Sequence, residues 1–191
     1  MPDTATVHPL TPDRFPDLEA LFATGGEARD CWCMYWRVTP KGWDAGSGET
    51  RRAAFRDRVA AGPPPGLLAY RGAEAVGWVQ VTPRAEVPRF NRARSAKPSP
   101  PDADLNSVWA LSCFYLRKDA RRRGLMTVLA REACAFAARH GAAAVEAAPI
   151  TPRRPLMWGE GYVGIASALE RAGFLVVETR TDLRSLMRWV P

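Results

Sequence analysis

The segment from residue 108 to residue 139 constrains the fold more than any other part of the chain. Residues 108–116, VWALSCFYL, form an apolar run with the length and aromatic content of a β-strand. Residues 125–139 carry apolar side chains at helical spacing, and Gly141 follows as a helix-ending residue. A second apolar strand is predicted at residues 143–148. The sequence therefore predicts a βαβ unit with a tight turn between its first strand and its helix.

The turn between this strand and this helix is rich in arginine. Arg121, Arg122 and Arg123 come directly before Gly124, where the helix is expected to begin. The first turn of a helix has backbone N–H groups without intrahelical acceptors, and the helix dipole is positive at that end. These amides and the arginines predict a binding site for a phosphate or a pyrophosphate. The alternative is a solvated corner, because the whole chain is arginine-rich, with 24 arginines and 3 lysines.

Arg121, Gly124 and Met126 fall on the three defining positions of the acyl-CoA signature of the GNAT N-acetyltransferase superfamily, which this chain resembles. Arg121 and Gly124 match the signature, whereas Met126 stands where the family has a small residue. The resemblance covers roughly residues 65–190. It includes residues 170–174, ERAGF, which are similar to a motif that ends a helix in the family.

The resemblance implies a single GNAT-like domain over residues 1–191, of the α/β class with a mixed α+β sheet. The expected acyl-CoA N-acyltransferase fold has a central mixed sheet of about six to seven strands flanked by about four helices. Residues 1–64 are expected to form a helical wall around the acceptor substrate, and residues 65–191 the sheet and the acyl-CoA-binding core. The sheet is expected to split between its strands at 108–116 and 143–148, which would admit the pantetheine arm.

Capping residues, periodicity and turn residues predict the remaining elements. Thr11 and Pro12 indicate the start of a first helix, and one strand is expected before it. Residues 85–106, rich in proline and charge, predict a long loop, and residues 149–161 a second irregular segment. The other predicted elements are a helix at 50–60, strands at 67–70 and 75–82, a short helix at 163–172, and an antiparallel strand pair at 174–179 and 185–190.

The resemblance implies that acetyl-CoA is the acyl donor and that an amine attacks its thioester directly. This reaction needs a neutral amine, a polarised thioester carbonyl and a protonated leaving thiolate. In the family a main-chain N–H at a strand bulge polarises the carbonyl, and here that position falls near Phe114. The residues expected to bind acetyl-CoA are Phe114, Tyr115, Leu116, Arg121, Arg122, Arg123, Gly124, Leu125, Met126 and Thr127.

The proton-transfer residues depart from the family pattern. Many members place a tyrosine acid where this chain has Leu169, and some place a glutamate base where it has Ala110. Neither of these side chains can transfer a proton. Each of the residues that could replace them also has a purely structural interpretation: it could pack a helix, lie on a strand or anchor a loop. The expected catalytic residues are Tyr162 and Glu146, with Tyr115, Ser167 and a water chain as alternatives.

Residues 30–37, DCWCMYWR, are expected to select the acceptor, because the family walls its acceptor site with the link between its first two helices. One interpretation is a cation-accepting aromatic pocket, in which Asp30 pairs with the amine. The other is a small aromatic core under the helices. Cys31 as an acetyl-accepting nucleophile would need a neighbour that lowers its pKa, and no histidine is close in sequence. The expected substrate-binding residues are Asp30, Trp32, Tyr35 and Trp36.

Composition limits the class of protein. With 191 residues, 47% of them hydrophobic, the chain can bury one sizeable core. No apolar run reaches the ~18 residues of a membrane span. The N-terminus lacks the basic and apolar regions of a signal peptide, so we expect a cytoplasmic protein. The four cysteines and two histidines lack the spacing of a zinc site, and no metal is expected.

The formal net charge of +7 is concentrated in residues 84–123, where ten basic and four acidic residues give +6. Such a patch attracts polyanions, of which coenzyme A is one and nucleic acid another. Nucleic acid is the less favoured ligand, because aromatic residues do not alternate with the basic ones. A catalytically weak acyl-CoA-binding sensor or partner module is the main alternative to an enzyme. The expected ligands are acetyl-CoA and a small amine, for a monomer or homodimer that does not bind a membrane.

Overall fold

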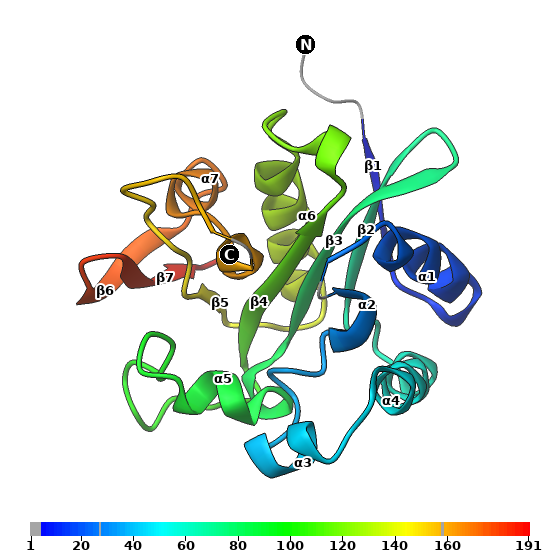
Figure 1. Ribbon diagram of the computed structural model, residues 1–191. Helices are drawn as coiled ribbons and strands as arrows, with labels where there is room; N and C mark the ends of the chain where they lie inside the picture. The colour runs from blue at the N-terminus through cyan, green and yellow to red at the C-terminus, as the bar shows by residue number, and fades with distance from the viewer. Residues whose placement is uncertain (1–4, 27, 158) are drawn as a thin grey trace.

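The computed structural model describes residues 5–26, 28–157 and 159–191, and the strands within these ranges form one mixed sheet (Figure 1). The strand order is β1-β2-β3-β4-β5-β7-β6. β4 and β5 run parallel, whereas the other neighbouring pairs run antiparallel. The strands are β1 (Thr6–Pro9), β2 (Gly66–Arg71), β3 (Glu74–Pro83), β4 (Val108–Leu116), β5 (Ala144–Ala147), β6 (Leu175–Thr181) and β7 (Arg184–Trp189).

Seven α-helices and four 3₁₀-helices occur within the described ranges. Four of the α-helices, α1, α4, α6 and α7, lie where the sequence predicted helices. The others, α2, α3 and α5, have four or five residues each and lie where the sequence predicted no helix. The α-helices are α1 (Phe15–Ala23), α2 (Ala28–Cys31), α3 (Pro40–Asp44), α4 (Gly48–Ala61), α5 (Pro88–Arg92), α6 (Leu125–Arg139) and α7 (Ala166–Glu170), and the 3₁₀-helices are η1 (Pro12–Arg14), η2 (Arg84–Glu86), η3 (Lys118–Ala120) and η4 (Glu160–Val163).

The βαβ unit predicted from the sequence is present. β4 and α6 have the predicted bounds, and β5 pairs with β4 in parallel. Gly124 precedes α6 with φ of +81°, a left-handed conformation that favours glycine. The helix predicted at 50–60 begins earlier, at Gly48, because Ser47 and Thr50 form a capping box.

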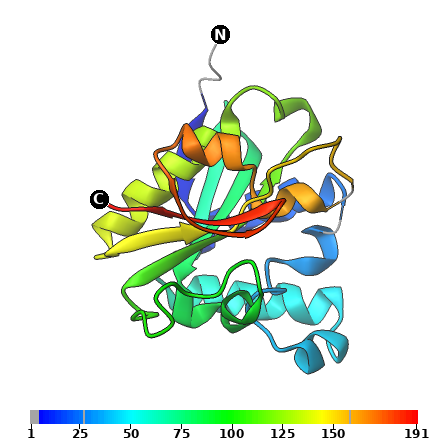
Figure 2. The same cartoon turned by 90° about the vertical axis from the view of Figure 1, so that its left-hand side faces the viewer.

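The sheet is packed on both faces. One face carries α6 and α7 over the larger core, where Val79, Leu111 and Leu129 are fully buried. The other face carries α1 and α4, and there Trp78 and Phe55 are fully buried. β6 forms one edge of the sheet, and Figure 2 looks onto that edge. β4 thus lies inside the sheet, between two helical layers.

β4 contains a bulge within its pairing with β3. Leu111 pairs with Val81 and Cys113 pairs with Gln80, so Ser112 is the extra residue. Ser112 contacts Gln80, and Cys113 packs against the core under α1 and α4. The two successive side chains therefore lie on the same side of the sheet, as a bulge produces. The resemblance to the family implied a bulge near Phe114, and the observed bulge at Ser112 lies two residues before it.

β4 and β5 separate beside this bulge. β5 pairs with Val108, Trp109 and Ala110, whereas β4 continues to Leu116. The two strands diverge from that point in Figure 1. The split expected between these strands is therefore present.

Residues 85–106, predicted as a long loop, form a folded segment that contains most of η2 and all of α5. Val87, Phe90 and Ala96 of this segment pack on Ala110 of β4 in a third, smaller core. The segment therefore covers β4 at Ala110. Sequence periodicity did not reveal this packing, because the apolar residues are few and separated by prolines and charges.

Candidate active site

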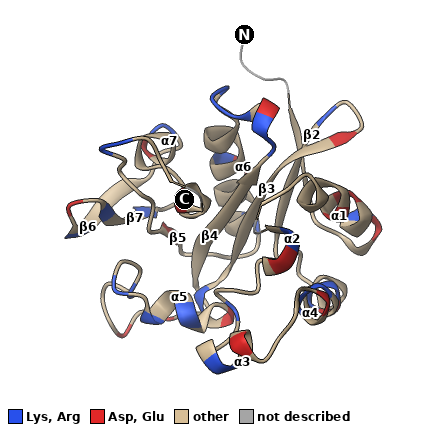
Figure 3. Cartoon of the chain, viewed as in Figure 1, with Lys and Arg blue, Asp and Glu red and all other residues tan. Residues whose placement is uncertain are grey.

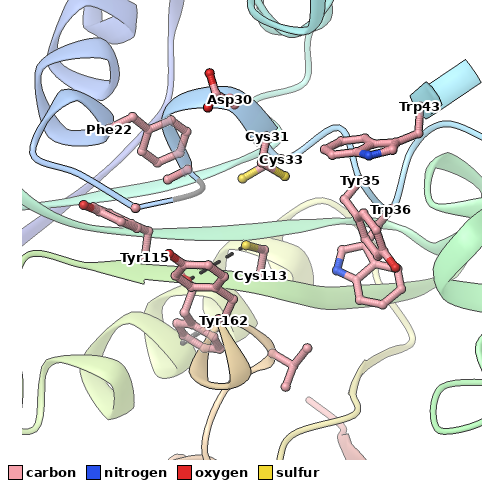
Figure 4. A pocket seen from close by; sticks show the side chains of 15 residues that line it. Phe22, Asp30, Cys31, Cys33, Tyr35, Trp36, Trp43, Cys113, Tyr115 and Tyr162 are labelled. Carbon is pink, nitrogen blue, oxygen red and sulfur yellow. Dashed lines mark hydrogen bonds between the residues drawn. The ribbon is translucent and has the colours of Figure 1, made fainter. Parts of the chain in front are cut away.

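A cavity of about 670 Å³ opens between the link after α1 and the middle of β4 (Figure 4). Its walls come from residues 22–26 and 28–43, from residues 113–115 of β4 and from residues 159–163. Aromatic rings dominate the lining, and Asp30 is the charged side chain among the lining residues that the structure describes. Six residues that the sequence singled out lie together here: Asp30, Tyr35, Trp36, Phe114, Tyr115 and Tyr162.

Two tyrosines stand next to each other in the cavity wall, with ring centroids 6.3 Å apart. The hydroxyl of Tyr115 donates to the carbonyl oxygen of Gly25 at 2.8 Å, which ties the link after α1 to β4. The hydroxyl of Tyr162 lies against Gly26, where an added Cβ would be 2.8 Å from the phenolic oxygen. The two tyrosines thus bring the link after α1, strand β4 and helix η4 together in one wall of the cavity.

Asp30, Tyr35 and Trp36, three of the four residues expected to bind the acceptor, line the cavity. The guanidinium carbon of Arg89 lies 3.8 Å from the centroid of the Tyr35 ring. The indole N–H of Trp36 donates to the carbonyl oxygen of Ser112 at 3.0 Å. Tyr35 therefore already stacks on a cation, and the polar atom of Trp36 is bound to β4.

Trp32, the fourth of these residues, is placed in the core and not in the cavity wall. The residue is 6% exposed, and its ring centroid lies 6.0 Å from that of Phe15 and 5.3 Å from that of Phe22. Trp32 and Cys33 have φ of +50° and +54°, so the chain turns sharply between Trp32 and the residues that line the cavity. Trp32 is therefore packed in the aromatic core and does not line the cavity, unlike the other three expected residues.

Glu146, one of the two expected catalytic residues, lies in a buried ion-pair network and not in the cavity wall. Its side chain is 0% exposed, and its carboxylate accepts hydrogen bonds from Arg84 and Arg188. The same arginines donate to the carbonyl oxygens of Ala96 and Ser99, so the network fixes the 85–106 segment against β5 and β7. Both carboxylate oxygens are therefore occupied by guanidinium groups, and the side chain does not reach the cavity. The prediction of a catalytic Glu146 therefore does not fit the structure, which gives this residue a structural role.

The arginine-rich turn and the start of α6 lie at the C-terminal end of β4, where Figure 3 shows basic residues in the turn. Arg121, Arg122 and Arg123 are exposed, and the Nε of Arg121 donates to the carbonyl oxygen of Leu116 at 2.9 Å. An added Cβ at Gly124 would meet no described atom within 4 Å. Exposed guanidinium groups, open space and the first amides of a 15-residue helix fit a pyrophosphate.

The side chains after Gly124 point into the protein. Leu125 and Thr127 are buried, and the Oγ1 of Thr127 donates to the carbonyl oxygen of Ala168 at 3.0 Å. The Sδ of Met126 accepts from the backbone N–H of Ile165 at 3.3 Å. Backbone amides are therefore what these residues can offer a ligand, and the Met126 side chain leaves the space above Gly124 open.

Leu169 and Ala110, where the family carries its usual acid and base, are both fully buried. Leu169 belongs to the larger core, and Ala110 is covered by the 85–106 segment. Ser167 is exposed on α7, outside the described lining of the cavity. Of the proton-transfer candidates, Tyr115 and Tyr162 are therefore those that lie at the cavity.

Three free cysteines, Cys31, Cys33 and Cys113, line the cavity, and Figure 4 shows their sulfur atoms on its walls. Burial raises the pKa of Cys31 to about 12. A hydrogen bond with Cys33, together with burial, raises the pKa of Cys113 well above its ordinary value. Thiols with raised pKa values are poor nucleophiles at neutral pH, so the structure does not favour Cys31 as an acetyl acceptor.

Sequence reasoning missed several residues of the cavity wall. Trp43 of α3 packs edge-on against Tyr35, and the guanidinium carbon of Arg51 lies 4.1 Å from the Trp43 ring centroid. A lone tryptophan in a polar, glycine-rich stretch was the available signal for it. Cys113 faces the cavity because of the bulge, and a bulge within an apolar strand leaves no mark in the hydrophobic pattern.

Within residues 5–26, 28–157 and 159–191, no three His, Cys, Asp or Glu side chains are grouped so that they could hold a metal ion. In the same ranges, no helix is both long and apolar enough to span a bilayer.

The chain matches the model of the Acetyltransferase (GNAT) family over residues 28–156. Among solved structures, it is similar to the GNAT domain of PAT from S. lividans, with a TM-score of 0.56 and 16% identity over 98% of this chain and 90% of that one. It is also similar to ribosomal-protein-alanine N-acetyltransferase from Brucella melitensis, with a TM-score of 0.55 and 18% identity over 97% and 99%. An aminoglycoside acetyltransferase in complex with coenzyme A gives 0.54 and 14% over 98% and 95%. No curated protein sequence matches. These structures confirm the predicted fold class, a GNAT-like mixed sheet.

Proposed function

Because this chain belongs to the GNAT acetyltransferase family, we propose that it transfers the acetyl group of acetyl-CoA to the amine of a small molecule. The observation that carries the proposal is the end of β4, where an arginine-rich turn, open space above Gly124 and the N-terminus of α6 meet. This combination suits a pyrophosphate. Residues 111–116 of β4 extend beyond the pairing with β5, which suits an extended arm laid along the strand.

We assign donor binding to three groups of residues. Arg121, Arg122 and Arg123 supply positive charge, and residues 124–126 supply backbone amides. Thr127 closes the first turn, because its N–H donates to the carbonyl oxygen of Gly124 at 3.0 Å. Phe114, Tyr115 and Leu116 provide the strand along which the arm lies. A coenzyme A complex of an aminoglycoside acetyltransferase with a similar fold supports this choice of ligand. The coenzyme supplies the activated thioester, and the chain binds it, orients it and polarises its carbonyl through the main chain at the β4 bulge.

Tyr162 is the proposed general acid for the leaving thiolate. It lines the cavity from η4, beside Tyr115, whose own hydroxyl donates to Gly25. An ordinary phenol and an ordinary thiol have pKa values within about two units of each other, so proton transfer between them costs little. Water is the proposed base, because Ala110 cannot accept a proton and both oxygens of the Glu146 carboxylate are bound by arginines.

The proposed acceptor is a small amine on an apolar or aromatic body. A cavity of about 670 Å³ has the size of a site for a small molecule. The rings of Tyr35 and Trp36 attract apolar groups, and the Asp30 carboxylate can pair with an ammonium group.

In this proposal residues 1–64 form the acceptor wall and residues 65–191 the sheet and donor site of one domain, although residues 1–4 and 27 lie outside the described residues. We expect the protein to act in the cytoplasm as a monomer or homodimer. The second candidate function is an acyl-CoA-binding module with weak catalysis. It is favoured by the burial of Leu169 and Ala110 in apolar cores.

Calorimetric titration of acetyl-CoA into two matched variants tests the donor site. Gly124 and Gly141 stand at opposite ends of α6 with φ of +81° and +80°, and an added Cβ meets no described atom within 4 Å at either. Asparagine tolerates this conformation, so Gly124→Asn and Gly141→Asn should have similar backbone costs. We expect Gly124→Asn to weaken binding by about tenfold or more, or ~1.4 kcal/mol, because its side chain fills the space above the turn.

Gly141→Asn is the control and should bind acetyl-CoA as the native protein does. Equal affinities of the two variants would contradict the placement of the pyrophosphate at this turn. Incubation of the native protein with acetyl-CoA and a panel of cationic and aromatic amines then separates the two candidate functions. An acetyltransferase forms an N-acetylated product, more slowly in Tyr162→Phe, whereas a binding module forms none with any amine.

A further inference from the structure

Ser112, the extra residue of the β4 bulge, is held by two side chains from outside its strand. The indole N–H of Trp36 donates to its carbonyl oxygen at 3.0 Å, and the amide nitrogen of Gln80 donates to its hydroxyl at 2.7 Å. Ser112 and Gln80 are buried, with 1% and 0% exposure. Because a bulge interrupts regular strand pairing, these two bonds fix the backbone where the sheet itself holds it least.

The hydrogen-bonded chain continues away from β4. The Oε1 of Gln80 accepts from the Nε of Arg37 at 3.1 Å, and Arg37 donates to Glu86 at 2.6 Å. Glu86 binds Arg58 of α4 through both carboxylate oxygens, at 2.7 and 2.8 Å. The amide oxygen of Gln80 is thus occupied by Arg37, so its nitrogen must face Ser112.

Trp36 also belongs to the wall of the cavity in which the acceptor is proposed to bind. Its ring packs edge-on against Tyr35 and Phe90, with centroid distances of 4.8 and 5.4 Å. The ring is therefore held on two sides while its N–H reaches the bulge. One side chain connects the acceptor wall to the β4 backbone.

We propose that Trp36 is a positioning residue for acetyl transfer: its indole N–H fixes the β4 bulge, whose main chain polarises the thioester carbonyl. This inference rests on the proposed function. A main-chain donor stabilises developing negative charge only if it is already in place and need not reorganise during the reaction. Without the indole N–H, the buried carbonyl of Ser112 loses its donor, and the backbone relaxes to recover one.

Infrared difference spectroscopy of bound acetyl-CoA, labelled with ¹³C at its thioester carbonyl, tests this role without any acceptor. The variant is Trp36→Phe, which keeps an aromatic ring but removes the N–H. In the native protein we expect the carbonyl stretch to lie at lower wavenumber than in free acetyl-CoA. In Trp36→Phe it should move back toward the free value while the affinity for acetyl-CoA stays the same. Once an acceptor is known, kcat should fall by about tenfold at an unchanged KM for acetyl-CoA.

Trp43→Phe is the matched control, because Trp43 lines the same cavity but its ring contacts Tyr35 and Arg51. Its carbonyl stretch should equal that of the native protein. If Trp36→Phe does not fold, as judged by urea unfolding, Ser112→Ala removes the Gln80 bond instead and should give a smaller change of the same sign.

The outcomes separate this inference from the proposed function. Native protein that does not bind acetyl-CoA would overturn both. Native protein that binds acetyl-CoA without a shift of the carbonyl stretch, or a shift that persists unchanged in Trp36→Phe, would overturn the role of Trp36 alone.

Discussion

Two ion-pair networks of the same composition, each with one glutamate and two arginines, lie on either side of η2. Glu86 binds Arg37 and Arg58, and its side chain is 27% exposed. Glu146 binds Arg84 and Arg188, and its side chain is 0% exposed. Arg84 and Glu86 both belong to η2, so one short helix contributes a member to each network.

The difference between the two networks lies in what each is connected to. The Glu86 network leads through Arg37 and Gln80 to the β4 bulge, and therefore to the proposed active site. The Glu146 network ends on backbone carbonyl groups of the 85–106 segment, which it holds in place. Identical residue types thus connect to the proposed site in one case and hold the 85–106 segment in the other, and burial and the neighbouring groups make the difference.

The largest expected effect is that of Glu146→Gln. It keeps the shape of the side chain but leaves the guanidinium of Arg84, 0% exposed, without a counter-charge. Breaking a buried pair in this way costs about 3–5 kcal/mol. Urea unfolding at pH 7 measures the loss. A loss below about 1 kcal/mol would show that the network is not what holds the 85–106 segment.

A smaller, pH-dependent effect is expected from Glu86→Gln. Burial by itself would raise the pKa of the Glu86 carboxyl, but hydrogen bonds from Arg58 and Arg37 outweigh it and lower the pKa to about 2. A carboxyl with a lowered folded-state pKa stabilises the protein above its unfolded-state pKa. We therefore expect Glu86→Gln to lose about 2 kcal/mol at pH 7, less than the full shift implies because the group is partly exposed.

The pH dependence is the sharper part of this prediction. The contribution of Glu86 is complete above pH 4.5, its ordinary pKa, and is lost as the pH falls toward about 2. The difference in free energy of unfolding between the native protein and Glu86→Gln should shrink over that range and stay constant above it. Urea titrations at pH 7, 5, 4 and 3 measure it. A difference that is the same at pH 7 and pH 3 would contradict the lowered pKa.

The smallest effect is expected for a third network of this composition, on the surface between α1 and α4. Glu19 binds Arg52 and Arg56, whose side chains are 44% and 55% exposed. Exposed ion pairs contribute about 0–1 kcal/mol, because solvent screens them and the side chains lose entropy. Glu19→Gln should therefore leave the urea midpoint almost unchanged. A loss of stability as large as that of Glu86→Gln would mean that the contributions of the three networks to stability do not increase with their burial.

The ion pairs of these networks could not be predicted from the sequence, whereas the local elements could. The β4–α6–β5 unit could be predicted to within two residues, because its helix and strands show clear local periodicity. The partners of Glu146 are 42 and 62 residues away in sequence, and no local pattern announces such pairs. The sequence therefore predicts a catalytic Glu146, whereas the structure places it in an ion-pair network.

The candidate site was predicted unevenly for the same reason. The composition of residues 30–37 predicted an aromatic segment at the site. It did not show that the Trp32 ring lies in the core and the Trp36 ring at the cavity, because this difference arises from the positive φ of Trp32. Ser112 and Gln80 gave no signal, since their importance arises from a bulge that only the pairing with β3 defines. Roles in acetyl transfer stay predictions for every residue of the site.

The 85–106 segment, which packs over Ala110, limits which residues can be introduced at this position. A glutamate introduced there, to restore the usual base of the family, would replace a methyl group packed against Val87, Phe90 and Ala96. It would also lie beside Glu146, its neighbour across the β4–β5 pair. Overpacking therefore opposes a larger side chain at this position. A designed base must therefore be built into the link after α1 or into η4, because β4 at Ala110 has no room for it.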